Sequence, residues 1–343
     1  MYRALQALGH EPIGFPWHKY FCAASGAPSG IVSLLRRAQN KYLLGPAITR
    51  LNADFLDLVA REQPQAVIVY RGTHIYPQTL RQIRAVSPGS VLVGYNNDDP
   101  FAPKHFPRLF RFFLAGIPEY DVVFAYRHRN LEDYRIAGAR RVELLRSWFV
   151  PERNHPVELN SAERDTFGCD VAFVGHYEDD GRVAYLEQIV RRGWKFRLYG
   201  PGWDPVIGKS GILSSLTPVR PVWGEDYNKA LCGAKIALCF LSKLNRDTYT
   251  RRCFEIPATR TMMLSEYSDD LAGMYRQGAE ADYFNDIDSM LEKIAHYLGD
   301  DNLRQAVAQG GWNRLRADGH DVLSRMQQFI GQIESVGRAK CTN

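Results

Sequence analysis

The sequence predicts an α/β protein with two doubly wound halves, each a parallel sheet covered by helices. Three observations support this prediction. Short apolar runs typical of buried strands alternate with helix-like segments along nearly the whole chain. The alternation restarts after an irregular segment at residues 148–168, which carries two prolines and several charges. A chain of 343 residues is also too long for one comfortable core, so two domains are expected.

The first half is expected to begin with a helix and to continue as alternating strands and helices. The opening helix covers residues 2–11 and has no strand before it, so the first strand of a doubly wound fold is missing or comes from elsewhere. Residues 22–63 read mostly as helix. Strands are expected at residues 65–72, 90–97, 121–127 and 141–147, with helices at 76–86, 106–116 and 130–138.

The second half repeats this pattern with five strands. They are expected at residues 169–176, 195–203, 235–242, 262–267 and 280–284, with helices at 181–193, 226–234, 254–259 and 269–278 and further helices from 289 to about 337. The predicted organisation is a first domain at residues 1–150, a linker at 151–168, a second domain at 169–320, and a helix with a tail at 321–343.

Composition and charge exclude several classes of protein. The chain has 45% hydrophobic and 24% charged residues, an ordinary globular mixture, and its 43 basic and 38 acidic residues give a net charge of +5. This excess is too small to indicate nucleic-acid binding. No apolar run reaches the roughly 18 residues of a membrane span, and the amino terminus lacks the pattern of a signal peptide. Six scattered cysteines without C-x-x-C pairing argue against a zinc site or a disulfide framework and favour the reducing cytoplasm.

Glycine turns in the second half are the first candidate binding feature. Two expected strands end in glycine, one at Gly175 before His176 and one at Gly200, and glycine there lets a ligand approach the backbone closely. Arg182 follows the first turn and could contact a diphosphate, and Trp203 follows the second and could stack on a base. The alternatives are tight turns that need glycine anyway, a solvated arginine and a packing tryptophan.

A carboxylate within an apolar run is the second candidate feature. Glu255 lies in "RRCFEIPATRT", residues 251–261, at the start of an expected buried helix. Acidic side chains are almost never fully buried unless they are paired. Glu255 therefore either forms a structural ion pair with Arg251 or Arg252, or it contacts a ligand.

The ordered set of motifs resembles a known family. The segments "FVGH", "LYGPGW", "VWGEDYNKALCGAKIALCF", "RRCFEIPAT" and "MMLSEYSDDL" resemble the carboxyl-terminal half of the CgeB-like glycosyltransferases, and "VYRGTHIYPQTL" and "YNNDDPF" extend the resemblance upstream to about Pro64. These proteins are similar to family 4 of the retaining nucleotide-sugar transferases. The resemblance implies the GT-B fold, in which two Rossmann-like doubly wound domains face a cleft. It also implies transfer of a sugar from a nucleotide-diphosphate sugar to a hydroxyl acceptor, with retention, without a metal and without a further cofactor.

The resemblance also implies roles for individual residues. Glu255 matches the acid that contacts the ribose hydroxyls of the donor, and Arg251 and Arg252 match basic residues near the diphosphate. Asp247, eight positions before Glu255, stands where relatives usually carry a glutamate that contacts the donor sugar.

The adjacent acids Asp98 and Asp99 in "YNNDDPF" are the candidate catalytic groups of the first half. In relatives this strand end carries an acid or a histidine close to the reacting sugar, where a carboxylate could accept the proton of the acceptor hydroxyl. The Asp-Asp-Pro sequence fits a helix cap equally well.

Other functions stay open at this point. A non-catalytic nucleotide-sugar-binding or scaffold protein on the same fold is one alternative, since the first strand is missing and Asp247 replaces glutamate. A dinucleotide oxidoreductase would need G-x-G-x-x-G after a strand, which the sequence lacks. The acceptor, whether saccharide, lipid-linked or protein, would bind the first domain. The basic and aromatic segment 104–113 could contact a membrane-linked acceptor, or it could form a buried amphipathic helix.

Overall fold

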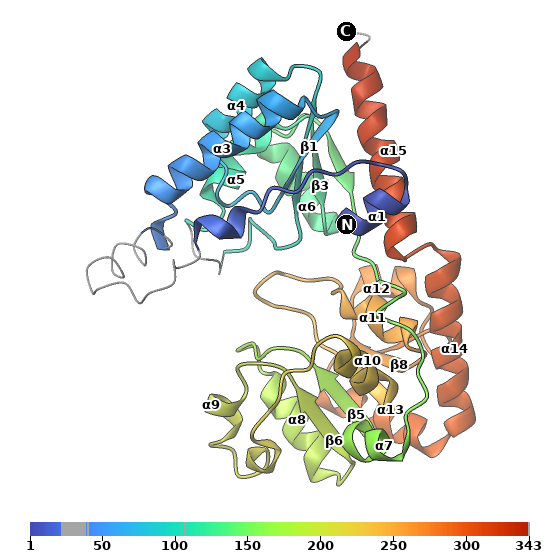
Figure 1. The fold of residues 1–343 in the computed structure, drawn as a ribbon. Helices are drawn as coiled ribbons and strands as arrows, with labels where there is room; N and C mark the ends of the chain where they lie inside the picture. Colours follow the sequence, from blue (N-terminus) through green and yellow to red (C-terminus); the bar gives the residue numbers. More distant parts are fainter. Residues whose placement is uncertain (22–38, 40, 104, 106–107, 342–343) are drawn as a thin grey trace. The chain divides into compact units, whose positions relative to one another are not determined.

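The computed structural model describes residues 1–21, 39, 41–103, 105 and 108–341, which divide into two units. The first unit contains residues 1–146 together with 326–343, and the second contains residues 147–325. Each unit has its own parallel sheet with helices packed against it (Figure 1).

The sheet of the first unit confirms the four expected strands. Strands β1 (Ala66–Tyr70), β2 (Val91–Asn96), β3 (Val122–Ala125) and β4 (Val142–Leu144) pair in parallel in the order β1-β2-β3-β4. Every residue of β2 is buried, as expected for a central strand covered on both faces. Among the described residues no strand precedes the first helix or adds a fifth strand to this sheet.

The helices of the first unit cover this sheet. They are α1 (Tyr2–Ala7), α3 (Pro46–Glu62), α4 (Pro77–Val86), α5 (Arg111–Gly116) and α6 (His128–Ile136), with short 3-10 helices at Trp17–Tyr20 and Ile117–Glu119. Helices α3 and α4 lie side by side (Figure 1). Within the helix expected at 106–116, residues 108–110 are not helical, α5 begins at Arg111, and residues 106–107 lie outside the described residues. Phe110 and Phe113 are buried in the core. Within the span expected to be mostly helical, residues 22–63, residues 22–38 and 40 lie outside the described residues.

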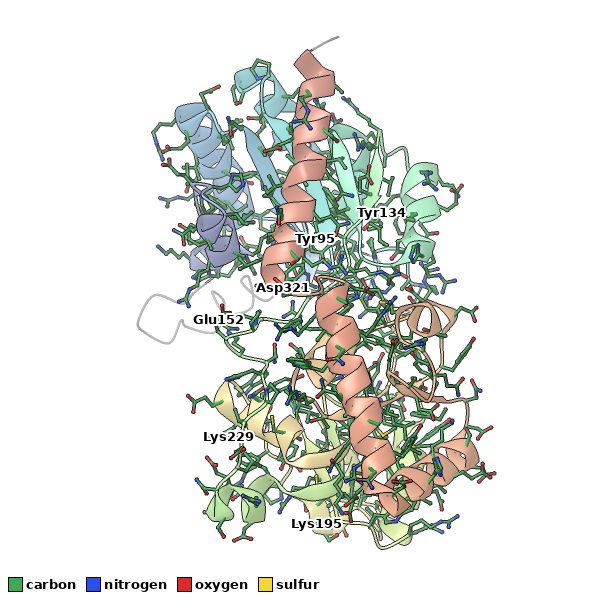
Figure 2. All side chains as sticks on the ribbon, turned by 90° about the vertical axis from the view of Figure 1, so that its right-hand side faces the viewer. Tyr95, Tyr134, Glu152, Lys195, Lys229 and Asp321 are labelled. Atoms are coloured by element: carbon green, nitrogen blue, oxygen red, sulfur yellow. The ribbon has the colours of Figure 1, made fainter. Side chains whose placement is uncertain are left out.

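The carboxyl-terminal helix α15 (Val322–Cys341) returns to the first unit from Met326 onward. Asp321 caps its start, accepting hydrogen bonds from the backbone N–H groups of Leu323 and Ser324 (Figure 2). Farther along, the ring of Phe329 packs on Phe124 of β3 at 4.6 Å between centroids. Residues 326–343 are thus part of the first core, whereas the sequence had suggested a separate helix and tail.

The second unit has a five-stranded parallel sheet in the order β6-β5-β7-β8-β9. Its strands are β5 (Cys169–Val174), β6 (Phe196–Tyr199), β7 (Ala234–Cys239), β8 (Met262–Glu266) and β9 (Asp282–Phe284). Its helices are α7 (Ser161–Phe167), α8 (Arg182–Arg191), α9 (Asp204–Ile207), α10 (Glu225–Cys232), α11 (Arg252–Ala258), α12 (Asp269–Met274), α13 (Ile287–Gly299) and α14 (Asp301–Ala317), with a 3-10 helix at Ser214–Leu216. All five expected strands are present.

The segment expected to be a linker is built into the second unit. Asn160 and Glu163 form a reciprocal capping box at the start of α7, a signal that the charges and prolines around it obscured. Glu163 also pairs with Lys229 of α10 at 2.9 Å, and Asn228 exchanges hydrogen bonds with the backbone of His155 (Figure 2). These contacts order residues 151–168 against α10.

The order of the second sheet places a topological switch point beside β5. Strand β5 is followed by β6 on one side, and the chain then crosses back over β5 to β7 on its other side, so the direction of winding reverses between β5 and β7. In open parallel sheets ligands bind in the crevice at the carboxyl ends of the two strands flanking such a point. A ligand-binding site is therefore expected among the residues that follow β5 and β7.

Two further properties of the described chain bear on its class. None of the described helices combines the length and apolar character that crossing a bilayer requires. The four cysteines with described side chains, Cys169, Cys232, Cys239 and Cys253, are free thiols.

Candidate functional site

The carboxyl end of β5 brings a glycine turn against the start of α11. A Cβ atom at Gly175 would lie 3.0 Å from Nη1 of Arg252 and 2.8 Å from the ring of Phe173, so a side chain there would displace the guanidinium. His176, the next residue, has an exposed side chain whose ring is partly shielded from water. Burial, and after it the charge of Arg252, lower the pKa of His176 below its usual value. The turn therefore holds Arg252 and His176 at the switch point.

Glu255 of α11 is held by a tyrosine. The hydroxyl of Tyr227, on α10, donates a hydrogen bond of 2.6 Å to Oε2 of Glu255. Within the described residues, neither Arg251 nor Arg252 forms an ion pair with the Glu255 carboxylate, and its second oxygen, Oε1, accepts no hydrogen bond. The structural ion pair considered from the sequence is therefore wrong.

Burial raises the pKa of Glu255, although the Tyr227 hydrogen bond and the charges of Arg251 and Arg252 act in the opposite direction. Such a carboxylate gains by accepting further hydrogen bonds, because an ionised group with an unfilled acceptor oxygen is poorly solvated away from water. Oε1 of Glu255 is the atom left for a ligand hydroxyl.

The two arginines at the start of α11 differ in their surroundings. Arg251 is exposed and lies 5.9 Å from the ring centroid of Trp148. Arg252 lies over the ring of Phe173 at 5.5 Å, and its Nε is buried without a hydrogen-bond partner. No acidic side chain in the described chain pairs with Arg252. Its guanidinium is thus a cation beside the switch point that an anionic ligand can neutralise.

Arg182 does not have the role expected for it. Its side chain is 2% exposed, forms ion pairs with Asp180 at 2.5 Å and Glu178 at 3.0 Å, and donates to the carbonyl of His176. Glu178 in turn accepts hydrogen bonds from Ser242 and the backbone of Leu244, both after β7. Each nitrogen of the guanidinium already donates a hydrogen bond, so Arg182 stabilises the loops of the site and is not available to a diphosphate.

Trp203 and Gly200 are also structural. Trp203 is fully buried, donates from Nε1 to the carbonyl of Gly175 at 2.8 Å and packs edge-on against Phe173. Gly200 has φ +131°, and a Cβ atom there would lie 2.1 Å from the Gly175 carbonyl oxygen. The two turns therefore pack on each other, which explains the glycine and contradicts the expectation that Trp203 stacks on a base.

The adjacent acids of the first unit separate into two environments. Asp99 is fully buried and accepts hydrogen bonds from the backbone of Phe101 at 3.0 Å and from Asn130 at 2.9 Å. It caps the turn after β2, and residues 100–103 that follow are not helical. Because the carboxylate is fully buried, a catalytic role for Asp99 is contradicted. Asp98 is partly exposed and pairs with Arg71 at 2.5 Å.

Asp247 lies in the loop between β7 and α11. Its backbone N–H donates to the carbonyl of Ser242 at 2.8 Å, which folds this loop back toward the end of β7. The side chain is half-buried. The loop thus begins and ends at the switch point.

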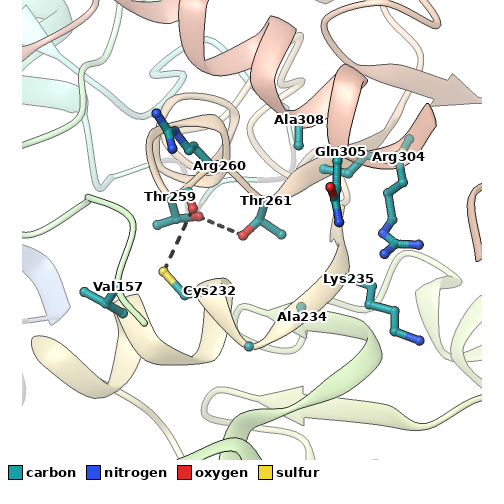
Figure 3. A pocket seen from close by; sticks show the side chains of 12 residues that line it. Val157, Cys232, Ala234, Lys235, Thr259, Arg260, Thr261, Arg304, Gln305 and Ala308 are labelled. Carbon is teal, nitrogen blue, oxygen red and sulfur yellow. Dashed lines mark hydrogen bonds between the residues drawn. The ribbon is translucent and has the colours of Figure 1, made fainter. Parts of the chain in front are cut away.

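A hollow lies at the opposite, amino-terminal edge of the sheet. Its volume is about 270 Å³, and its lining includes the starts of β7 and β8 together with residues of α14 (Figure 3). Cys232, Thr259 and Thr261 line it together with three cations, which are already engaged. Lys235 pairs with Asp170 and Arg304 pairs with Asp301, while Arg260 stacks over Trp312 at 4.4 Å. Two of the three cations of this hollow are therefore already paired with carboxylates, unlike Arg252.

Sequence reasoning missed Tyr227. It lies 28 residues before Glu255, in a short helix whose tyrosine looks like any packing residue. The only local signal was that an acid in an apolar run needs a partner.

Two parallel α/β units, the second with this strand order, define the GT-B fold, and solved glycosyltransferase structures share it. Sucrose-phosphate synthase from Thermosynechococcus elongatus superposes with a TM-score of 0.63 at 11% identity, covering 84% of this chain and 78% of that one. HepE from Anabaena, solved in complex with UDP-glucose, gives 0.62 at 11% identity over 83% and 82%. A glycosyltransferase from Rickettsia africae gives 0.62 at 9% identity over 98% and 92%.

The match to a family model lies mostly in the second unit. Residues 182–331 match the model of a family described as glycosyl transferase-like, a range that contains Tyr227, Arg252 and Glu255. No curated protein matches the chain. This part of the chain is thus similar to the glycosyl transferase-like family, and the CgeB-like subtype stays a prediction.

Proposed function

We propose that the protein is a glycosyltransferase that moves a sugar from a nucleotide-diphosphate sugar to a hydroxyl acceptor. The observation that carries the proposal is the pair formed by Glu255, with an unoccupied carboxylate oxygen, and Arg252, with no acidic partner, at the switch point of the second sheet. A nucleoside diphosphate offers the vicinal diol of its ribose to Glu255 and the negative charge of its diphosphate to Arg252. The glycosyl transferase-like family match and the UDP-glucose complex of HepE support this assignment.

In this proposal Glu255 accepts hydrogen bonds from the ribose hydroxyls, and Arg252 contacts the diphosphate. As the bond between the sugar and the diphosphate breaks, negative charge grows on the leaving phosphate, and a guanidinium fixed nearby stabilises that charge more than the ground state. His176 and the exposed Arg251 lie where they could add to this stabilisation. Catalysis would then depend on support of the leaving group more than on a strong base.

The remaining assignments follow from the resemblance. Asp247 would contact the donor sugar, and Asp98 would act near the acceptor hydroxyl. Retention of the anomeric configuration, and an acceptor that is a saccharide, a lipid-linked molecule or a protein, belong to the same proposal. No cofactor beyond the donor substrate is required.

A non-catalytic nucleotide-sugar-binding protein is the second candidate. Two observations favour it. Asp99 is buried, so only Asp98 of the two adjacent acids is available for chemistry. Position 247 carries aspartate in place of the glutamate usual in relatives. Turnover of a donor separates the two candidates.

The test is a panel of nucleotides and nucleotide-diphosphate sugars, UDP and UDP-glucose among them, measured by thermal unfolding, calorimetry and donor hydrolysis. Wild type is compared with Glu255→Gln and with Glu292→Gln, an exposed residue of α13, as the matched control. We expect one nucleotide to bind wild type and the control, and to bind Glu255→Gln at least about tenfold more weakly, because a charge-assisted hydrogen bond is lost. A folded Glu255→Gln with wild-type affinity would remove the ribose assignment.

Hydrolysis of the bound donor would support an enzyme. Binding without hydrolysis, even with a range of acceptors, would favour the non-catalytic candidate. Failure of every nucleotide to bind wild type would reject both.

A further inference from the structure

The Glu255 carboxylate is controlled from another helix. Tyr227 is the third residue of α10, and Glu255 is on α11, yet the Tyr227 hydroxyl lies 2.6 Å from Oε2 of Glu255. Helix α10 itself packs against β5 and β7, the two strands that flank the switch point. The tyrosine is therefore anchored to the same framework as the site.

The ionisation of both partners fits a tyrosine that donates. Burial, and after it the neighbouring Glu255 carboxylate, raise the pKa of Tyr227 well above its ordinary value, so the hydroxyl keeps its proton. Burial also raises the pKa of Glu255, and the strongest influence in the opposite direction is the hydrogen bond from Tyr227, ahead of Arg251 and Arg252. Without the phenol, the buried carboxylate would be protonated more readily.

The geometry of a carboxylate explains why this matters for binding. A tyrosine hydroxyl offers one proton, so it occupies one oxygen of Glu255 and leaves the other free. A free and ionised oxygen accepts hydrogen bonds from the hydroxyls of a diol, whereas a protonated carboxyl has one oxygen that donates instead. An arginine at the same place could occupy both oxygens at once.

We propose that Tyr227 is the positioning residue of the donor site, holding Oε2 of Glu255 so that Oε1 is left to accept hydrogen bonds from the donor's hydroxyls. This inference rests on the donor-binding role proposed above for Glu255. It adds that a residue of α10 sets both the orientation and the charge of that group. Tyr227 itself touches no reacting atom in this account.

Other titratable groups surround the pair but act on different atoms. Arg251, the residue before α11, and Arg252 act on Glu255 through their charges. Cys239 at the end of β7 and Cys253 on α11 interact with Arg252, as does His176 after β5. Since His176 also titrates, the pH dependence of binding alone does not isolate Glu255. The protonation of the carboxyl group has to be observed directly.

The chain offers a closely matched control. Tyr275 is fully buried, and its hydroxyl also bonds to α11, donating to the backbone carbonyl of Cys253 at 2.9 Å. It makes no hydrogen bond to Glu255. Tyr275→Phe therefore removes a buried hydroxyl that bonds to α11, without removing the hydrogen bond between Tyr227 and Glu255.

The experiment has two readouts. The first is infrared titration of the ligand-free protein, with the Glu255 carboxyl band identified as the difference between each variant and the same variant carrying Glu255→Gln. The second is calorimetric affinity for UDP across the same pH range. Thermal unfolding confirms that Tyr227→Phe and Tyr275→Phe are folded.

We expect Tyr227→Phe to protonate Glu255 at higher pH than wild type and to bind UDP about tenfold more weakly near neutral pH, the loss growing as the pH falls. We expect Tyr275→Phe to leave both readouts at their wild-type values. A wild-type Glu255 titration in Tyr227→Phe would overturn the inference, and so would an equal shift in Tyr275→Phe, which would indicate general loosening of α11.

The two readouts also separate this inference from the proposed function. If Tyr227→Phe shifts the titration of Glu255 but the wild-type protein binds no nucleotide, Tyr227 still controls Glu255 and the proposed donor site is rejected. An unshifted titration in a protein that binds UDP would keep the donor site and reject the role of Tyr227.

Discussion

Replacing Arg182 by methionine tests whether this arginine is a structural brace or a ligand contact. Methionine keeps much of the length of the side chain and removes the charge and all of the hydrogen bonds. In the folded protein the Arg182 side chain is 2% exposed, and its partners Asp180 and Glu178 are 4% and 11% exposed. The change therefore leaves two carboxylates uncompensated in a place that water barely reaches.

The size of the effect follows from these exposures. Removing one partner of a buried ion pair costs about 3–5 kcal/mol, because the remaining charge is neither paired nor hydrated. For a unit of this size each kcal/mol lowers the melting temperature by roughly 2–4 °C, so a decrease of about 10 °C is expected. Glu178 also receives hydrogen bonds from Ser242 and Leu244, which spreads the disturbance to the loop after β7.

The assay is thermal and urea unfolding of wild type, Arg182→Met and Arg191→Met, the last being an exposed arginine of the same helix. Adding Asp180→Asn to Arg182→Met should recover part of the stability, because it removes one uncompensated charge. A folded Arg182→Met with the wild-type melting temperature and a lost nucleotide affinity would refute the reasoning and return Arg182 to the diphosphate.

Two further predictions concern the cores. Gly200→Ala should prevent stable folding of the second unit, because its Cβ would lie 2.1 Å from the Gly175 carbonyl oxygen. The control Gly193→Ala has φ +77° and nothing within 4 Å of the added Cβ, so it should lower the free energy of unfolding by only about 1–2 kcal/mol. Circular dichroism and thermal unfolding distinguish the two variants. Burial alone would raise the pKa of Asp121, but its hydrogen bonds, one of them from Lys340, lower it below the ordinary value. Asp121 therefore stabilises the fold above its unfolded pKa of about 3.9, and this contribution is lost as the pH falls through the folded pKa. Asp121→Asn should be less stable near neutral pH and should show a weaker loss of stability between about pH 5 and pH 2; an acid unfolding profile parallel to that of wild type would contradict this role.

The sequence determined the strands and their parallel pairing. Residues 171–174 and 236–239 are continuous apolar runs, and short apolar runs that alternate with helices are typical of buried parallel strands. It also singled out Glu255, because an acid in an apolar run needs a partner or a ligand. Both predictions depend on the pattern of adjacent residues alone, so the sequence is sufficient for them.

The tertiary structure decided which polar groups meet. Arg182 and Arg252 look equally suited to a diphosphate in the sequence, but two nearby acids occupy the first and none pairs with the second. Tyr227 reaches Glu255 across 28 residues. Hydrogen bonds and ion pairs act over a few ångströms, so their partners are fixed by how distant segments pack, and the chain order of the residues does not contain that information.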